Sequence, residues 1–205
     1  MVAAEPPDDP QAFGHVPVLF DEVMAALLPH DGGVYIDATV GLGGHAEGIL
    51  ERSGPGGRLL ALDADPEALH RAQARLAAYD ERVAWAQARH SDLAAVARAC
   101  GFGRVDGILL DLGVSSLQLD DPARGFSFQA DGPLDMRMGP DVPLTAEEII
   151  NTWPEAELAR VIYEYGEEHR ARRVARLICQ RRPFHSTAEL AAAVARAVGY
   201  GGKIH

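Results

Sequence analysis

The chain has 205 residues, of which 47% are hydrophobic, enough for one large domain or for a core with a smaller lobe. No apolar run approaches the roughly 18 residues of a membrane-spanning helix, and Cys100 and Cys179 lack the spacing of a metal site or a disulfide framework. The formal net charge of −11 argues against a nucleic-acid partner, although residues 160–205 carry nine Lys or Arg against four Asp or Glu. We therefore expect a cytoplasmic protein with no metal and no membrane partner, whose C-terminal part is basic.

The N-terminal half predicts strands that alternate with helices. Residues 1–13 lack the basic start and apolar run of a signal peptide, and we expect a short disordered tail there. Asp65 and Pro66 fit the N-cap and first position of a helix. The expected elements are an amphipathic helix within 15–29 (apolar at Val18, Leu19, Val23, Met24, Leu27 and Leu28), strands within 33–38, 57–66, 82–93 and 103–113, and helices over 45–53, over 66–79 and from its cap Ser91 to near Gly101. This alternation predicts an α/β fold with a doubly wound parallel sheet.

After Asp111 the pattern changes. Residues 113–143 are rich in Gly, Pro and paired acids, which predicts loops. Residues 145–198 predict helices only, and Thr145 with Glu148 and Ser186 with Glu189 form two capping-box signatures.

The strand count bears on the domain organisation. Four strands make about half of a doubly wound sheet, whose ligand crevice needs strands on both sides. We divide the chain into the tail, the first half of a Rossmann-like core over 14–112, and a loop-rich, mostly helical lobe over 113–205. We favour the interpretation that the lobe is an insertion, with the remaining core strands beyond residue 205. The alternative is an unusually small sheet.

A glycine-rich loop follows the first expected strand. Gly41, Gly43 and Ala46 match the relaxed G-x-G-x-x-G/A fingerprint of dinucleotide sites, and Asp63 follows at roughly the distance of a ribose-binding acid. No G-K-[ST] follows the glycines, which excludes a triphosphate P-loop. Because glycine loops also form simple tight turns, this pattern alone leaves the ligand open.

Asp37, four positions before Gly41, favours a different ligand. A carboxylate there repels a pyrophosphate but suits a ligand with an ammonium group, such as S-adenosylmethionine. The alternative is that Asp37 is only a helix cap or a turn former. Asp111, at the end of the fourth strand, falls where open α/β sheets bind ligands, and burying a carboxylate is costly unless it has a function.

Several motifs together resemble one family. The stretches GHVPVL, DATVGLGGHAEGIL, LALDADPEA, GILLDLGVSSLQLDDPARGFSF, GPLDMRM and GGKIH are similar to those of the RsmH (MraW) family of ribosomal RNA small-subunit methyltransferases. The resemblance implies a Rossmann-like class I methyltransferase fold with S-adenosylmethionine as cofactor. It also implies methylation of N4 of a cytosine in the decoding region of bacterial 16S rRNA, with the small ribosomal subunit as partner. Members of the family continue beyond the KIH stretch, which agrees with further strands.

The resemblance also implies site residues. To Asp37 and Gly41 it adds seven cofactor-binding positions: Gly43, Gly44, His45, Asp63, His90, Asp111 and Gln118. His90 departs from the family pattern, which has an aromatic such as Phe there, although an imidazole can still stack on adenine. The alternative for His45 is that it is an ordinary residue in the first turn of a helix.

The chemistry implied by the resemblance needs careful positioning, because the amine of cytosine is a poor nucleophile. Many amino-methyltransferases use Asp/Asn-Pro-Pro-aromatic at the end of strand four, and here Asp111 is present without the prolines and the aromatic. We expect Asp111 or a nearby backbone carbonyl to accept a hydrogen bond from N4, and Phe126 or Phe128 to stack on the base. The alternative is that the two phenylalanines are core residues of a folded loop.

A cytosine in structured RNA must leave its stack to react, and the acidic body would repel phosphate. We therefore expect RNA contacts in the helical lobe, from Arg124, Arg137, Arg170, Arg172, Arg173, Arg181 and Arg182. Such a basic run also occurs as a solvated helix face. Two other functions stay open: a non-catalytic RNA-binding or ribosome-assembly module, and an NAD-dependent oxidoreductase.

Overall fold

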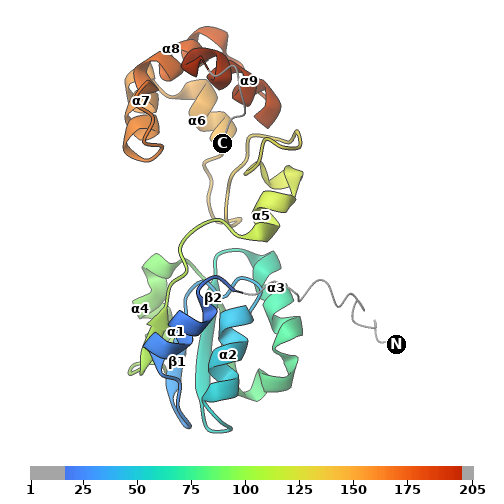
Figure 1. The fold of residues 1–205 in the computed structure, drawn as a ribbon, viewed down its shortest axis with the longest axis vertical. Helices are drawn as coiled ribbons and strands as arrows, with labels where there is room; N and C mark the ends of the chain where they lie inside the picture. The colour runs from blue at the N-terminus through green and yellow to red at the C-terminus, as the bar shows by residue number, and fades with distance from the viewer. Residues whose placement is uncertain (1–16, 200–205) are drawn as a thin grey trace, which may run out of the picture. The chain divides into compact units, whose positions relative to one another are not determined.

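A computed structural model describes residues 17–199, so the expected tail over 1–13 and the terminal GGKIH stretch lie outside the described residues. The chain divides between Gly113 and Val114 into two compact units, each of which is described by itself (Figure 1). Within the described residues, no helix combines the length and the apolar character needed to cross a membrane.

The first unit contains a four-stranded sheet in the order β3-β2-β1-β4, with all neighbouring strands parallel. This order begins the Rossmann order 3-2-1-4-5-6, and the chain reverses direction across the sheet between β1 and β4. The elements are α1 (Phe20–Leu27), β1 (Val34–Asp37), α2 (Gly44–Arg52), β2 (Arg58–Asp63), α3 (Pro66–Arg75), η1 (Ala77–Arg82), β3 (Val83–Gln87), η2 (His90–Asp92), α4 (Leu93–Ala99) and β4 (Gly107–Leu109).

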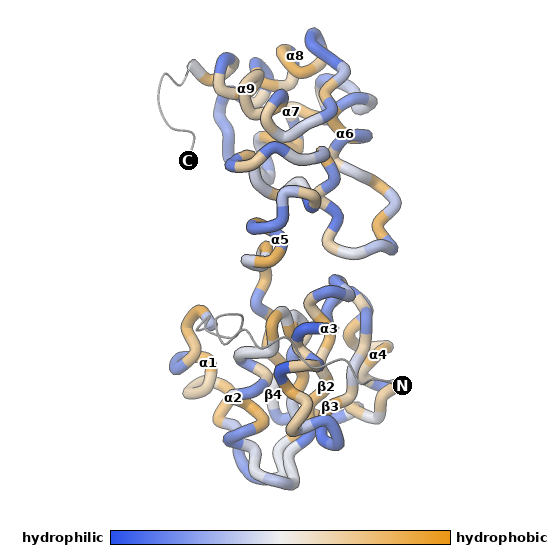
Figure 2. Tube along the Cα trace, turned by 90° about the vertical axis from the view of Figure 1, so that its right-hand side faces the viewer, coloured by the Kyte–Doolittle hydropathy of each residue, from blue (hydrophilic) through white to orange (hydrophobic). Residues whose placement is uncertain are grey.

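Helices cover both faces of this sheet. Because successive residues of a strand point to opposite faces, neighbouring residues of β1 contribute to different cores. Tyr35 of β1 faces a core built with α1, α2 and α3, and Ile36, the next residue, faces a core built with α4. Both side chains are at most 2% exposed, and the hydrophobic strands run through the middle of the unit (Figure 2). The expected α/β fold with a doubly wound parallel sheet is confirmed.

Three local expectations in the first unit were wrong. The first helix begins at Phe20, and Val18, Leu19 and Leu28 are more than 60% exposed because they lie outside it, with Leu19 and Leu28 in the left-handed conformation. Ser91 does not cap α4, because it lies within η2, and Asp92 occupies the N-cap position of α4. The fourth strand ends at Leu109, so Asp111 follows the strand instead of ending it. Asp65 does cap α3, through its side chain and the Glu67 N–H.

The second unit is built from helices around its own core. Its elements are α5 (Ser116–Asp120), η3 (Pro122–Arg124), α6 (Ala146–Thr152), α7 (Glu155–Glu164), α8 (Ala171–Arg181) and α9 (Thr187–Val198). Leu158, Ile178 and Phe184 are central to this core, and each is at most 5% exposed. The loop-rich segment belongs to the same unit, because Gly132 exchanges hydrogen bonds with Thr187 at the start of α9.

The helix caps follow the sequence in part. Thr145 and Ser186 accept hydrogen bonds from the backbone N–H groups of Glu148 and Glu189, as expected. The Glu189 carboxylate, however, accepts from the N–H of His185, one residue before the cap. A reciprocal capping box is instead formed by Ser115 and Gln118, whose S-x-x-Q spacing was a readable but missed signal.

Candidate functional site

The glycine loop starts as an extension of the sheet. Ala38 N donates to Leu109 O (2.9 Å) and Val40 N donates to Leu62 O (2.8 Å), so the chain leaving β1 runs between the ends of β4 and β2. The loop then turns at Gly41, which has a φ of +52°, and reaches α2 through Gly43, its N-cap, at +79°. The loop therefore lies at the switch point of the sheet, where open α/β folds bind ligands.

The glycines of this loop serve two purposes. Gly41 and Gly43 adopt positive φ angles that side chains with a Cβ disfavour. Gly44 has no such angle, but a Cβ there would overlap the ring of Pro17. Its small size lets the start of α2 pack closely on the segment that precedes α1.

Asp37 is buried at the carboxyl end of the central strand, with 1% of its surface exposed. Its Oδ1 accepts a hydrogen bond from the Thr39 N–H at 3.1 Å, so Asp37 does form a turn. Its pKa is raised to about 7, mainly by burial and to a smaller extent by repulsion from Asp63 and Asp111, against the opposing effect of that hydrogen bond. The alternative that Asp37 forms a turn is therefore confirmed, but a turn alone does not explain why this acid is buried close to two others.

Asp63, at the end of β2, fixes the glycine loop. Its Oδ2 accepts from Gly41 N (2.9 Å) and its Oδ1 accepts from Asp65 N (3.0 Å). Burial raises the pKa of Asp63, while these backbone hydrogen bonds lower it. An ionised carboxylate offers about four acceptor positions, so Asp63 retains the capacity to bind a ligand hydroxyl.

Asp111 is exposed, unlike the other two acids. Its N–H donates to the Thr39 hydroxyl oxygen at 2.7 Å, and this links the end of β4 to the turn that Asp37 forms. The expectation that a buried carboxylate marks function therefore applies to Asp37 and not to Asp111. The sequence reasoning missed Thr39, although a Thr two positions after a strand-end Asp is a recognisable turn signal.

We call Asp37, Asp63 and Asp111 the strand-end acids. Asp37 and Asp63 are the last residues of β1 and β2, and Asp111 lies two residues after the end of the neighbouring strand β4, at the same edge of the sheet. Asp63 and Asp111 both act electrostatically on Asp37. The site therefore concentrates negative charge beside the glycine loop.

The two histidines lie in different surroundings. His45 is 7% exposed in the first turn of α2, where its Nε2 lies 3.0 Å from Val18 O and its ring stacks on Phe20. These contacts agree with the alternative that His45 is an ordinary residue in the first turn of a helix. His90 is exposed at the start of η2, shortly after β3.

The remaining candidate cofactor and catalytic residues lie in the second unit. Gln118 is 5% exposed, and its Oε1 accepts from Ser115 N at 3.1 Å. Phe128 is 46% exposed and Phe126 is half-buried, and neither belongs to the hydrophobic core of its unit. The alternative that these phenylalanines are core residues is wrong for Phe128, which is exposed, and stays a prediction for the half-buried Phe126.

Four of the seven candidate RNA-binding arginines use their guanidinium groups within the protein. Arg124 donates to the carbonyls of Arg137 and Met138, and Arg137 forms a two-pronged ion pair with Asp135, which lowers the pKa of that carboxyl group. Arg170 donates to Val198 O, and Arg182 to the carbonyls of Ile150 and Trp153. These arginines hold loops and helix ends together.

The other three arginines are exposed. Arg172 and Arg173 lie in the first turn of α8 and Arg181 lies at its end. Within residues 17–199 their side chains have no hydrogen-bond or ion-pair partner.

The model of the MraW methylase family matches residues 12–204. The chain belongs to the MraW methylase family. Its similarity to "Ribosomal RNA small subunit methyltransferase H" of Syntrophobacter fumaroxidans is 50% identity over 190 residues, which is 91% of this chain and 60% of the relative. The protein of the same name from Carboxydothermus hydrogenoformans is 51% identical over 189 residues, with the same two coverages.

The chain thus spans about 60% of the length of the curated relatives that it matches. Among solved structures, a SAM-dependent O-methyltransferase from Thermotoga maritima aligns with 37% of this chain and 29% of its own, at 23% identity and a TM-score of 0.34. That likeness is too distant to inform the ligand or the chemistry of this chain.

The buried Asp37 predicts a specific pH dependence of stability. Its pKa is about 7 when folded against 3.8 as the ordinary value, so the folded state binds the proton more tightly and stability falls as pH rises from about 4 to 7. In Asp37→Asn the decrease in stability that Asp37 causes between pH 4 and 7 is absent. At pH 8 the free energy of unfolding of the variant is therefore higher than that of the wild type, by on the order of 1–4 kcal/mol. Urea unfolding at several pH values measures this difference.

The matched control is Asp80→Asn, which changes the same charge at an exposed position of η1. It is expected to leave the pH dependence of the wild type unchanged. An Asp37→Asn protein whose stability falls with pH as steeply as that of the wild type would show that Asp37 is ionised at all these pH values.

Proposed function

We propose that this chain is the cofactor-binding and RNA-binding part of an S-adenosylmethionine-dependent methyltransferase. Its substrate is N4 of a cytosine in the decoding region of bacterial 16S rRNA, presented by the RNA or the small ribosomal subunit in the cytoplasm. The observation that carries the proposal is the arrangement of the strand-end acids beside a glycine loop at the switch point of the sheet. Family membership and the printed names of the relatives support the choice of RNA.

The charge of the site favours this cofactor over a dinucleotide. A pyrophosphate would bring two negative charges to the strand-end acids, whereas the ammonium and sulfonium groups of S-adenosylmethionine are cations. Asp37 would hold the ammonium group, directly or through water, and Asp63 the ribose hydroxyls. Gly41, Gly43 and Gly44 would let the ligand approach the backbone, with His90 against the adenine and His45 and Gln118 as further contacts.

When bound, S-adenosylmethionine supplies a methyl group on a positively charged sulfur. The residues of this chain would position the acceptor amine for it. The exposed carboxylate of Asp111, or a carbonyl close to it, would accept hydrogen bonds from N4 and stabilise the positive charge that grows on the nitrogen. Phe126 or Phe128 would stack on the cytosine, and the 46% exposure of Phe128 leaves its ring accessible for this role.

For the RNA contact, Arg172, Arg173 and Arg181 are the stronger candidates, because their guanidinium groups are not used within residues 17–199. Arg124, Arg137, Arg170 and Arg182 already bind carbonyl or carboxylate groups and would reach RNA only through their remaining donors. The free arginines would bind phosphate groups without regard to sequence.

The proposal has one competitor with an observation in its favour. Because the chain spans about 60% of its relatives, this part could bind cofactor and RNA without transferring a methyl group. The NAD-dependent oxidoreductase has no such support, since the strand-end acids oppose a pyrophosphate.

The cofactor assignment predicts a selective ligand effect. S-adenosylmethionine raises the melting temperature of the chain, and NAD at the same concentration does not. Asp37→Asn weakens S-adenosylmethionine binding about tenfold or more, because it removes a charge-assisted hydrogen bond, and Asp80→Asn does not. Thermal-shift titrations measure both effects, and equal stabilisation by NAD would overturn the assignment.

The transfer step predicts a defect in Asp111→Asn. Loss of the acceptor charge lowers methyl incorporation into small ribosomal subunits by about 100-fold, with a smaller change in the affinity for S-adenosylmethionine. Radiolabelled methyl transfer measures the rate, with Asp80→Asn as the control. Full activity in the variant would remove Asp111 from the mechanism, and a wild-type chain that binds both ligands without transfer would support the binding module.

The RNA assignment predicts that the double variant Arg172→Glu, Arg173→Glu binds a fluorescent RNA of the decoding region more weakly. The slope of log affinity against log salt should also fall by about one to two. The control is Arg98→Glu with Arg104→Glu, which makes the same charge change at exposed positions of the first unit. Unchanged binding by the first pair would exclude this surface of α8.

A further inference from the structure

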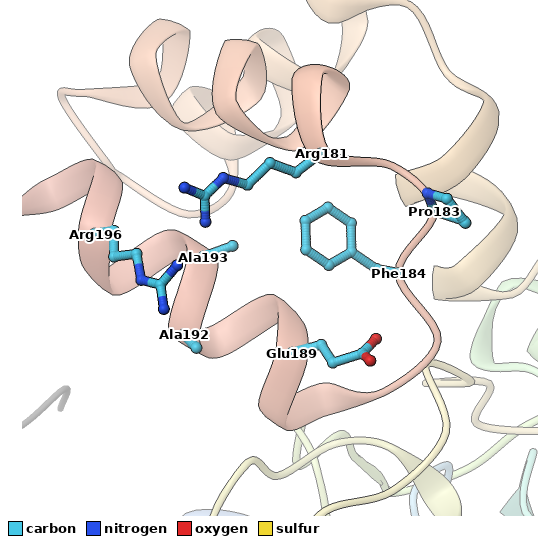
Figure 3. Close-up of a pocket in the computed structure, with 7 residues that line it drawn as sticks. All are labelled: Arg181, Pro183, Phe184, Glu189, Ala192, Ala193 and Arg196. Carbon is cyan, nitrogen blue, oxygen red and sulfur yellow. The ribbon is translucent and has the colours of Figure 1, made fainter.

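The second unit contains a pocket between the end of α8, the connection that follows it and one side of α9, with a volume of about 560 Å³. Figure 3 shows the residues that line it. Pockets of roughly 300–1,000 Å³ are of the size that binds small organic ligands. Three kinds of group line it: two guanidinium groups from Arg181 and Arg196, one carboxylate from Glu189, and the aromatic ring of Phe184. Of these residues only Arg181 was a candidate from the sequence.

The wall of the pocket that carries Phe184 is fixed by hydrogen bonds. The side-chain amide of Asn151 in α6 donates to Phe184 O (2.8 Å) and accepts from Phe184 N (2.9 Å). Arg182, one residue before the pocket's Pro183, donates to two carbonyls at the end of α6. The connection between α8 and α9 is therefore held in place before any ligand arrives, and the ring of Phe184 is packed in the core with only 5% of the residue exposed.

The charges of the pocket are separated. The guanidinium groups of Arg181 and Arg196 lie on one side and the Glu189 carboxylate on the other (Figure 3). Neither arginine has an ion-pair or hydrogen-bond partner for its side chain within residues 17–199. Glu189 is oriented by the His185 N–H, which donates to its Oε2 at 2.9 Å. Its other oxygen is left to accept a further hydrogen bond.

We propose that this pocket binds one nucleotide of a single-stranded stretch of the RNA substrate, and this rests on the function proposed above. The phosphate lies between Arg181 and Arg196, an amino or hydroxyl donor of the nucleotide faces Glu189, and the apolar part lies against Pro183 and the exposed edge of Phe184. A small anion without an apolar part, such as inorganic phosphate, would gain from the arginines but be repelled by Glu189. A nucleotide has both the anion and the donors.

The experiment follows the amide signals of Arg181, Phe184 and Glu189 by NMR in the full 205-residue chain. The titrants are cytidine 5′-monophosphate and inorganic phosphate, each in the millimolar range. The same protein is then tested for binding of a short fluorescent single-stranded RNA. Two variants impair the pocket in different ways: Arg181→Ala with Arg196→Ala removes the cations, and Ala192→Trp fills the space on an exposed part of its wall.

The matched controls make the same changes elsewhere. Arg98→Ala with Arg104→Ala removes two exposed cations from the first unit, and Ala156→Trp adds a large side chain at an exposed position of α7. We expect both pocket variants to lose the response to the nucleotide and to bind the RNA about tenfold more weakly, while the controls bind like wild type.

Three outcomes would overturn the proposal. The nucleotide could fail to shift the three signals, inorganic phosphate could bind as tightly as the nucleotide, or Ala192→Trp could bind the nucleotide like wild type. Binding of the nucleotide by a chain that does not bind the longer RNA would contradict the RNA function and not the pocket. The two failures are therefore distinguishable.

Discussion

The burial of one carboxyl group, that of Asp37, is the constraint around which the first unit is organised. The central position of β1 gives Asp37 neighbours on both sides, β2 with Asp63 and β4 with Asp111 nearby. Removing such a group from water is unfavourable, and the Thr39 N–H offsets only part of that cost. The site thus keeps an acid at a buried position, and under the proposed function a cationic ligand would offset the remaining cost of its burial.

The same hydrogen bonds that hold the acids also shape the glycine loop. Asp63 accepts from Gly41 N, and Thr39 joins the turn of Asp37 to the backbone of Asp111. The loop and the ends of three strands therefore form one connected unit. A change at Asp37 or Asp63 would alter both the charge of the site and the hydrogen bonds that hold the loop, so the conservative Asp→Asn replacement is the informative one.

In the second unit, arginine has two distinct uses. Arg182 and Arg170 donate to backbone carbonyls at or just after the ends of helices. The last carbonyl groups of a helix have no hydrogen-bond partner within the helix itself. Arg172, Arg173 and Arg181 keep their charges exposed. A basic sequence such as HRARRVARLICQRR thus contains both structural and free cations, and the count of charges overstates the surface that an RNA could use.

The sequence by itself determined the alternation of strands and helices, the positions of Asp37 and Asp63 at the ends of their strands, and the helical nature of residues 145–198. These follow from local periodicity, from glycine and proline, and from caps such as Asp65, all of which act between residues close in the chain. Only the tertiary structure decided that Asp37 is buried and Asp111 exposed, that His45 contacts Val18, and that Arg181 shares a pocket with Glu189 and Arg196. The burial of a side chain and the identity of its contacts depend on which elements pack together. Contacts between residues distant in the sequence leave no periodic pattern in it.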